Sequence, residues 1–182
     1  MLGPLLTNWT IRLALVCYAA VLAGEIAAPQ AARRSMVARS IWSLGCLLFV
    51  GHVVCAFHFF HHWSHAHAYE HTALRTADIG FPFGAGIYFS YAFGLLWIAD
   101  VMWWWTAPQS YAARATWLNN LLHLYLFFIA FNGAVVFEDG PTRWVGCAVA
   151  LGLLLLLARR ILERRTARQP TLTSEPGASP DR

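Results

Sequence analysis

Five long apolar stretches follow one another along the chain, separated by short polar segments. Each stretch holds about 20 mostly apolar residues, the length that an α-helix needs to cross the hydrocarbon core of a membrane. The connecting segments are short enough to keep all five helices in one compact bundle. The pattern therefore predicts an all-α polytopic membrane protein with five transmembrane helices, at residues 10–28, 41–62, 84–105, 116–137 and 144–161.

The composition supports this interpretation. Of the 182 residues, 58% are hydrophobic and only 12% are charged, whereas about 25% of the residues in a soluble domain are charged. So few charges cannot cover a water-facing surface, and membrane lipid is the expected surrounding. Arginines in the connecting segments explain the net charge of +4, so we expect no nucleic acid partner. The four cysteines form no CxxC pair, which argues against a disulfide framework.

The chain divides into one membrane domain and a polar tail. Residues 1–162 form the predicted single five-helix transmembrane domain. Residues 163–182 include the segment "RQPTLTSEPGASPDR", rich in Pro, Ser and Thr, which lacks the apolar surface that would order it. We predict that this tail is disordered and cytoplasmic.

Arginines gather in alternate connecting segments, and this sets the predicted orientation. Basic residues are kept on the cytoplasmic side of a membrane protein. The N-terminus is therefore predicted outside and the C-terminus inside, in a multi-pass protein of the bacterial inner membrane. The arginines of the predicted inner side are Arg33, Arg34, Arg39, Arg114, Arg159, Arg160, Arg164, Arg165 and Arg168.

The segment "FHFFHHWSHAHAYEHT", residues 57–72, holds six of the eight histidines. If the second helix continues through it, four of them share one face with Cys55, because a helix turns by about 100° per residue. Neutral imidazole is the commonest side-chain metal ligand and suits Zn, Cu or Fe. We predict a transition-metal site at the outer end of the second helix. Its candidate ligands are His58, His61, His62 and His65, with His67, Glu70 and His71 as a second group, and Cys55 for a softer metal such as Cu(I).

Two short motifs in this segment resemble motifs of known families. "HFFHH" resembles one of the histidine boxes of membrane fatty-acid desaturases and hydroxylases, which bind two irons. "HAYEH" is similar to the HxxEH motif of inverted zinc peptidases, which implies His67 and His71 as zinc ligands and Glu70 as the base. The desaturases spread several boxes over distant segments, and the peptidase motif belongs to a long helix of a soluble domain. Neither context is present here, so the chain is assigned to neither family.

Ionisable residues within the spans form a second group of candidates, because such residues are costly in a membrane. Asp100 and His123 are predicted in the inner half of the bundle, as a proton or ion relay. His52 and His123, on two different helices, also meet the first requirement of a bis-histidine haem b site. We expect Glu25, Asn119 and Asn120 to serve helix packing instead.

The leading hypothesis is an integral membrane protein that binds a transition metal at the histidine-rich segment. Tyr88, Ser90 and Tyr91, at the start of the third helix, are predicted to donate the hydrogen bonds that imidazole ligands normally have. The alternatives are a haem or di-iron redox protein, a proton-coupled transporter, and a non-catalytic accessory subunit of a homo-oligomer or larger complex. The sequence names no substrate or reaction, so it leaves open whether the protein is an enzyme.

Overall fold

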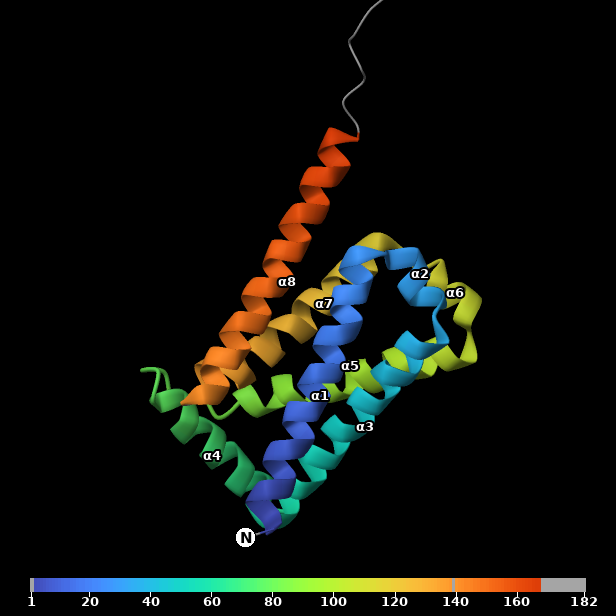
Figure 1. The fold of residues 1–182 in the computed structure, drawn as a ribbon. Coiled ribbons are helices and arrows are strands. Elements are labelled where there is room, and N and C mark those ends of the chain that lie inside the picture. Colours follow the sequence, from blue (N-terminus) through green and yellow to red (C-terminus); the bar gives the residue numbers. More distant parts are fainter. Residues whose placement is uncertain (1, 139, 168–182) are drawn as a thin grey trace, which may run out of the picture.

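The computed structural model describes residues 2–138 and 140–167, and all regular secondary structure in these ranges is helical. Figure 1 shows five long helices joined by turns and shorter helices. Each of the five is long and apolar enough to cross a membrane, which confirms the predicted all-α fold with five spans. They are α1 (Leu2–Ala27), α3 (Met36–Phe59), α5 (Gly86–Thr106), α7 (Thr116–Phe131), extended by the π-helical turn η1 (Asn132–Val136), and α8 (Pro141–Thr166).

The helices differ from the predicted spans at their ends. α1 begins at Leu2 and α3 at Met36, well before the predicted starts at residues 10 and 41. α8 continues to Thr166, inside the predicted tail of residues 163–182. The predicted bounds follow the densest part of each apolar run, whereas the helical backbone hydrogen bonds continue through the residues on either side of it. Residues 168–182 of the predicted tail lie outside the described residues.

Three short helices complete the described part: α2 (Pro29–Arg34), α4 (His65–Ala77) and α6 (Pro108–Ala112). A proline opens both α2 and α6, where its fixed φ suits the first helical turn. These two helices contact each other at one end of the bundle, and α4 lies at the other (Figure 1). We call the first the arginine end, defined by Arg33, Arg34, Arg39 and Arg114, and the second the histidine end, defined by residues 58–77.

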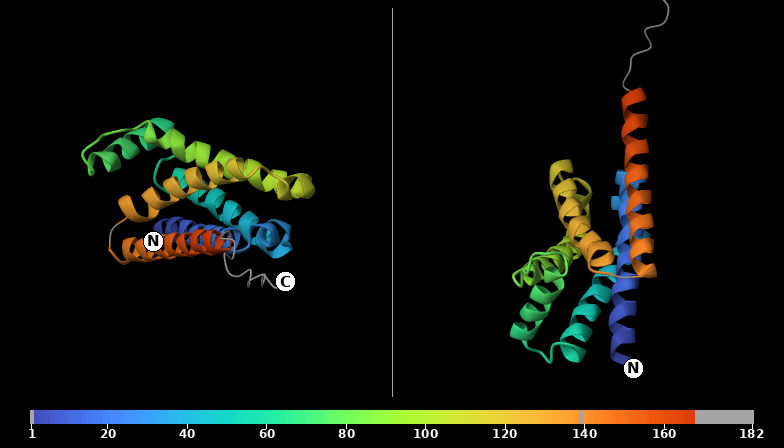
Figure 2. Two further views of the ribbon diagram at one scale, coloured as in Figure 1. Left: turned by 90° about the horizontal axis from the view of Figure 1, so that it is seen from above. Right: turned by 90° about the vertical axis from the view of Figure 1, so that its left-hand side faces the viewer.

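Contacts between the long helices run from α8 to α1, from α1 to α3, from α3 to α5 and from α5 to α7, and Figure 2 shows α1 and α8 side by side in both views. Aromatic side chains form the centre of the core. The rings of Tyr18 and Trp97 lie 5.7 Å and 4.9 Å from the ring of Trp42. Gly45 lets α1 and α5 approach α3 here, because a Cβ at this position would lie 2.9 Å from both Cys17 and Trp97.

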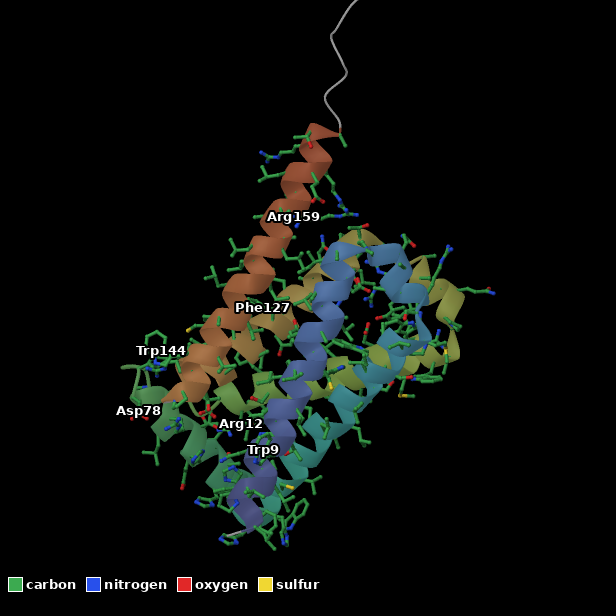
Figure 3. All side chains as sticks on the ribbon, in the orientation of Figure 1. Trp9, Arg12, Asp78, Phe127, Trp144 and Arg159 are labelled. Carbon is green, nitrogen blue, oxygen red and sulfur yellow. The ribbon has the colours of Figure 1, made fainter. Side chains whose placement is uncertain are left out.

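The outward faces of the long helices are apolar, as expected of surfaces that contact lipid. Leu151, Leu154 and Leu155 on α8 are each more than half exposed. Trp9 on α1 and Trp144 on α8 are exposed towards the histidine end, and Arg159 lies further along α8 (Figure 3). Indole rings prefer the boundary between lipid and water. The architecture is that of a multi-pass integral membrane protein.

Candidate functional site

The histidine end is built around a sharp turn between α3 and α4. α3 ends at Phe59, and the carbonyl of Ala56 accepts hydrogen bonds from the next two backbone amides, at 3.0 and 3.1 Å. His62 and Trp63 then adopt φ angles of 48° and 59°, in a left-handed region that is uncommon for residues other than glycine. The Oγ of Ser64 caps α4 by accepting a hydrogen bond from the amide three residues on, at 3.3 Å. The chain thereby turns sharply within residues 60–64, which connect the two helices.

This turn overturns one prediction made from the sequence. A continuous helix through residue 65 would place His58, His61, His62 and His65 on one face, but the helix has already ended at Phe59. The helical wheel could not anticipate this, because the turn uses a histidine and a tryptophan where a glycine would normally signal left-handed backbone. His58 lies on the last turn of α3, His61 and His62 lie in the turn, and His65 begins α4.

The turn brings together histidines from both predicted groups. The ring centroid of His61 lies 5.6 Å from that of His67 and 5.3 Å from that of His71. His62 stacks parallel to His67 with their centroids 6.4 Å apart. We call His61, His62, His67 and His71 the histidine cluster. It combines two residues of the turn with an i, i+4 pair from one face of α4.

The local environment favours the neutral form of two imidazoles in this cluster, those of His61 and His71. Burial, followed by the positive charges of His71, His67 and His62, lowers the pKa of His61 from its ordinary value of 6.5. Burial, followed by the charges of Arg75 and His67, lowers the pKa of His71 as well. The Nδ1 atom of His61 is buried without a hydrogen-bond partner in the described part of the chain. Neutral imidazole is the form that binds a metal ion.

The cluster is not a finished metal site. Within residues 2–138 and 140–167, no three His, Cys, Asp or Glu side chains stand together in an arrangement that would hold an ion. His62, His67 and His71 are exposed, whereas His61 is half-buried. Exposed side chains change rotamer readily, so the three outer rings are free to turn about the more fixed His61.

The other predicted ligands lie outside the cluster. His58 packs on Phe59 with ring centroids 4.7 Å apart. His65 forms a 3.0 Å hydrogen bond with the Tyr91 hydroxyl, and its other ring nitrogen lies 3.4 Å from the Tyr88 hydroxyl. Two of the three hydroxyls predicted to bond imidazoles thus lie beside His65. Glu70 is exposed on α4, and Cys55 is half-buried on α3.

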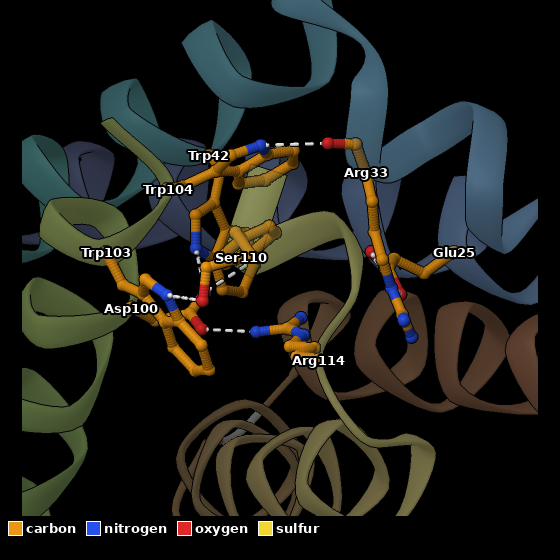
Figure 4. Close-up of polar contacts among 9 residues, drawn as sticks. Glu25, Arg33, Trp42, Asp100, Trp103, Trp104, Ser110 and Arg114 are labelled. Atoms are coloured by element: carbon orange, nitrogen blue, oxygen red, sulfur yellow. Dashed lines mark hydrogen bonds and ion pairs between the residues drawn. The ribbon is translucent and has the colours of Figure 1, made fainter. Parts of the chain in front are cut away.

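The arginine end contains buried ion pairs. The Asp100 carboxylate pairs with Arg114 at 2.5 Å and accepts hydrogen bonds from the Trp42 indole at 2.9 Å and the Tyr111 hydroxyl at 3.0 Å (Figure 4). Asp100 is 4% exposed and Arg114 6%. Burial and the charge of Asp100 raise the pKa of Tyr111, which keeps its hydroxyl protonated as a donor. The carboxylate is thus surrounded by three donors, which hold it in place.

A second buried pair lies beside the first. Arg33 of α2 pairs with Glu25 of α1 through Nε at 3.2 Å, and its backbone carbonyl accepts from the Trp104 indole at 3.0 Å (Figure 4). Glu25 thus links α1 to α2 through this ion pair. We call Glu25, Arg33, Asp100, Tyr111 and Arg114 the charged network. From the sequence, the two arginines were expected in connecting segments on the inner side, and neither was paired with an acid.

The predicted relay residues are neighbours of one tryptophan. Trp42 donates to Asp100 and its ring centroid lies 5.7 Å from that of His123. Both ring nitrogens of His123 are buried and lack a hydrogen-bond partner among the described residues, as does Oδ1 of Asn119. Trp42 thus stands between the carboxylate and the imidazole.

The predicted haem pair is not brought together. Nδ1 of His52 lies 2.9 Å from the carbonyl of Thr7, which fixes its ring against α1. His52 is ten residues beyond Trp42 on α3, a rise of about 15 Å along the helix axis, whereas His123 contacts Trp42 itself. The two imidazoles therefore lie at different depths in the bundle.

Comparisons with protein-family models, with curated proteins and with solved structures find no match to this chain. Its function is therefore inferred from the chemistry at its two ends: a histidine cluster in which burial lowers the pKa values of His61 and His71 at one, and buried ion pairs at the other.

Proposed function

We propose that this integral membrane protein binds a transition-metal ion at the histidine end, through the imidazoles of His61, His67 and His71. The observation that carries the proposal is the position of the His61 ring, 5.6 Å from His67 and 5.3 Å from His71 by ring centroids. Three imidazoles at this spacing need only ring rotations to direct one nitrogen each at a common point. His62 lies close enough to supply a fourth.

The chemistry of the donor atoms limits which metal ions can bind. A set of neutral nitrogen ligands suits Zn, Cu, Ni or Fe, and divalent copper binds most tightly to a given site of this kind. Tetrahedral zinc would use all four histidines or three and a water. The lowered pKa values of His61 and His71 support this proposal, because less proton competition has to be overcome at neutral pH.

Several contacts hold α4 as a platform for two of the ligands. Ala68, on α4 itself, is buried. The Tyr69 ring packs so closely over Gly84 that a Cβ at this position would collide with it. Near the end of α4, the Thr76 hydroxyl accepts a 2.6 Å hydrogen bond from the backbone amide of Phe83, and Arg75 donates to the carbonyl of Phe137. These contacts position His67 and His71 opposite the turn that carries His61.

Metal titration of the purified full-length protein tests the proposal. We expect Zn²⁺ or Cu²⁺ to bind by isothermal titration calorimetry and the triple variant H61A/H67A/H71A to lose that binding. His58→Ala is the matched control, because it removes a neighbouring histidine that packs on Phe59 outside the cluster. Equal affinity in the wild type and the triple variant would overturn the proposal.

We further propose that the arginine end faces the cytoplasm of a bacterial cell and the histidine end faces outward. Arg34, Arg164 and Arg165 are exposed towards the proposed inner side, and exposed basic residues resist translocation. Fusion of a fluorescent reporter that folds only in the cytoplasm to the C-terminus should give a bright cell. Activity of a periplasm-dependent reporter at the same position would reverse the orientation.

A proton or ion relay through Asp100 and His123 is a second candidate function. The unpartnered ring nitrogens of His123 favour it, because a buried imidazole normally has a partner or a bound water. Proteoliposomes that contain a pH-sensitive dye would measure proton flux. His123→Asn should abolish that flux, and His52→Asn, which alters a histidine bonded to Thr7, should preserve it.

A further inference from the structure

A pocket of about 460 Å³ opens at the arginine end, between α2, the start of α3 and α6. Its volume lies within the roughly 300–1,000 Å³ that is usual for small-ligand sites. Arg33, Arg34 and Arg39 line it, together with the amides of Gln30 and Gln109, and its lining within the described residues includes no carboxylate. Donors with positive charge thus dominate the pocket.

The charges of this pocket are only partly compensated. Both hydrogen bonds from the Arg33 side chain to Glu25 use Nε, so its terminal nitrogens are not occupied by that acid. Arg39 is 9% exposed, and its Nε is buried without a hydrogen-bond partner in the described ranges. Its guanidinium lies over the rings of Trp104 and Trp105, at 5.9 and 5.1 Å. Stacking holds this cation in place but satisfies none of its N–H groups.

We propose that the pocket binds a phosphate-bearing anion, with the headgroup of an anionic phospholipid as one source and free phosphate as the other. Guanidinium groups match phosphate oxygens in geometry and charge, and the two glutamines would add neutral donors. Two net positive charges remain after Glu25 is counted against Arg33, Arg34 and Arg39.

The position of the pocket fits this ligand. α2 and α6 connect the ends of membrane-crossing helices, and Trp105 beside Arg39 is exposed, as is usual for indoles at headgroup depth. Basic pockets between transmembrane helices are known to bind phospholipid headgroups. The site is separate from the histidine cluster, at the opposite end of the bundle.

Native mass spectrometry of the detergent-purified protein tests the proposal with added phosphatidylglycerol or phosphatidylcholine. The double variant R34Q/R39Q removes two charges from the pocket, and R164Q/R165Q removes two exposed charges from α8 as the matched control. We expect the wild type and the control to prefer phosphatidylglycerol, and the pocket variant to bind it about tenfold more weakly, as the loss of charge-assisted hydrogen bonds predicts. Equal binding of phosphatidylglycerol by all three proteins, or of both lipids by the wild type, would overturn a headgroup site.

Inorganic phosphate separates the two sources. Calorimetric binding of phosphate alone to the wild type, lost in R34Q/R39Q and kept in R164Q/R165Q, would identify the free anion as the ligand. If Arg39→Gln disturbs folding, Gln109→Glu provides the second test, because it places an exposed carboxylate at the pocket without removing an arginine. It should weaken the binding of the same ligand. Absence of both lipid preference and phosphate binding in the wild type would refute the proposal.

Discussion

The histidine end and the arginine end differ in how their ionisable side chains are buried and paired. At the histidine end, six histidines follow closely in sequence, and most remain exposed on a turn and on α4. At the arginine end, two acids and two arginines that are scattered along the chain form buried ion pairs. Crowding in the sequence thus produced an adaptable surface, and convergence in the fold produced a fixed polar core. The exposed histidines suit reversible binding of a small ligand, and the buried ion pairs suit holding the helices in fixed positions.

The cost of each arrangement differs accordingly. Exposed imidazoles lose little hydration, so the histidine cluster requires few compensating contacts. A buried carboxylate is tolerated only when donors surround it, and Asp100 has three, from Trp42, Tyr111 and Arg114. Substitutions within the charged network should therefore affect stability, and substitutions within the histidine cluster should affect metal affinity.

Asp100→Ala should have the largest effect on stability. The substitution leaves the buried guanidinium of Arg114 without its acid and the Trp42 indole without its acceptor. We expect a loss of about 3–5 kcal/mol in the free energy of unfolding, the usual result of breaking a buried ion pair from one side. Denaturant unfolding in detergent, followed by tryptophan fluorescence, would measure it.

Two further variants test the cause of that loss. Glu163→Ala breaks an exposed pair with Arg159 on α8 and should change stability little. The double variant D100L/R114M removes both buried charges and should be more stable than Asp100→Ala alone, since no unpaired charge remains. If Asp100→Ala costs no more than Glu163→Ala, the contrast between the two ends is wrong.

The sequence predicted the number of membrane-spanning helices well, because each span is a long apolar run with few charges. It identified Asp100 and His123 because ionisable residues stand out in such runs. It missed Arg33 and Arg114, whose acids lie 8 and 14 residues away, on other elements of the fold. Loop arginines have no local feature that distinguishes a buried pair from an exposed cation, so only the packing of α2 and α6 could reveal them.

His61→Ala should have the next largest effect, on metal affinity and not on stability. His61 is the ring that approaches both His67 and His71. We expect metal affinity to fall by about 100-fold. Removal of a residue that only hydrogen-bonds a metal ligand costs up to about this much, and His61 is proposed as a ligand itself. Metal titration would measure it, with His65→Ala as the control, since that ring bonds Tyr91 instead. Equal losses in both variants would mean that the cluster is not the site.

Acidification should weaken the histidine end selectively. The pKa values of His61 and His71 are lowered from 6.5 by burial and neighbouring positive charges. Above 6.5 these rings are neutral whether or not α4 is docked, so pH has no effect. Below 6.5 a detached α4 takes up protons that the docked one resists, so docking loses stability until the pH passes the lowered values.

Hydrogen exchange would detect this change. Between about pH 7.5 and about pH 5.5, which span the ordinary titration of histidine, the protection of amides 65–77 should fall after correction for intrinsic rates. Amides of α3 near Trp42 should keep their protection, because that part of the helix packs in the aromatic core. Equal losses in both segments would indicate general unfolding and contradict a local effect.

The sequence also predicted the histidine segment as the metal-binding candidate, but with the wrong geometry. Helical spacing suggested His58 and His65 as ligands alongside His61, and the turn at residues 60–64 separated them. The positive φ angles of His62 and Trp63 leave no signal in the residue types. The i, i+4 spacing of His67 and His71 was informative, because it lies wholly within α4.

The smallest predicted effect comes from removing one helix cap at each end of the bundle. The Oγ of Ser64 caps α4 and that of Ser35 caps α3, each accepting a backbone hydrogen bond, at 3.3 and 3.2 Å. Loss of such a cap costs about 0.5–2 kcal/mol of helix stability. Ser64→Ala should loosen the helix that carries His67 and His71 and so weaken metal binding, whereas Ser35→Ala should lower global stability and leave metal affinity unchanged. Unfolding and metal titration of both variants would measure this, and a reversed pattern would show that the two ends are coupled through α3 and do not act separately.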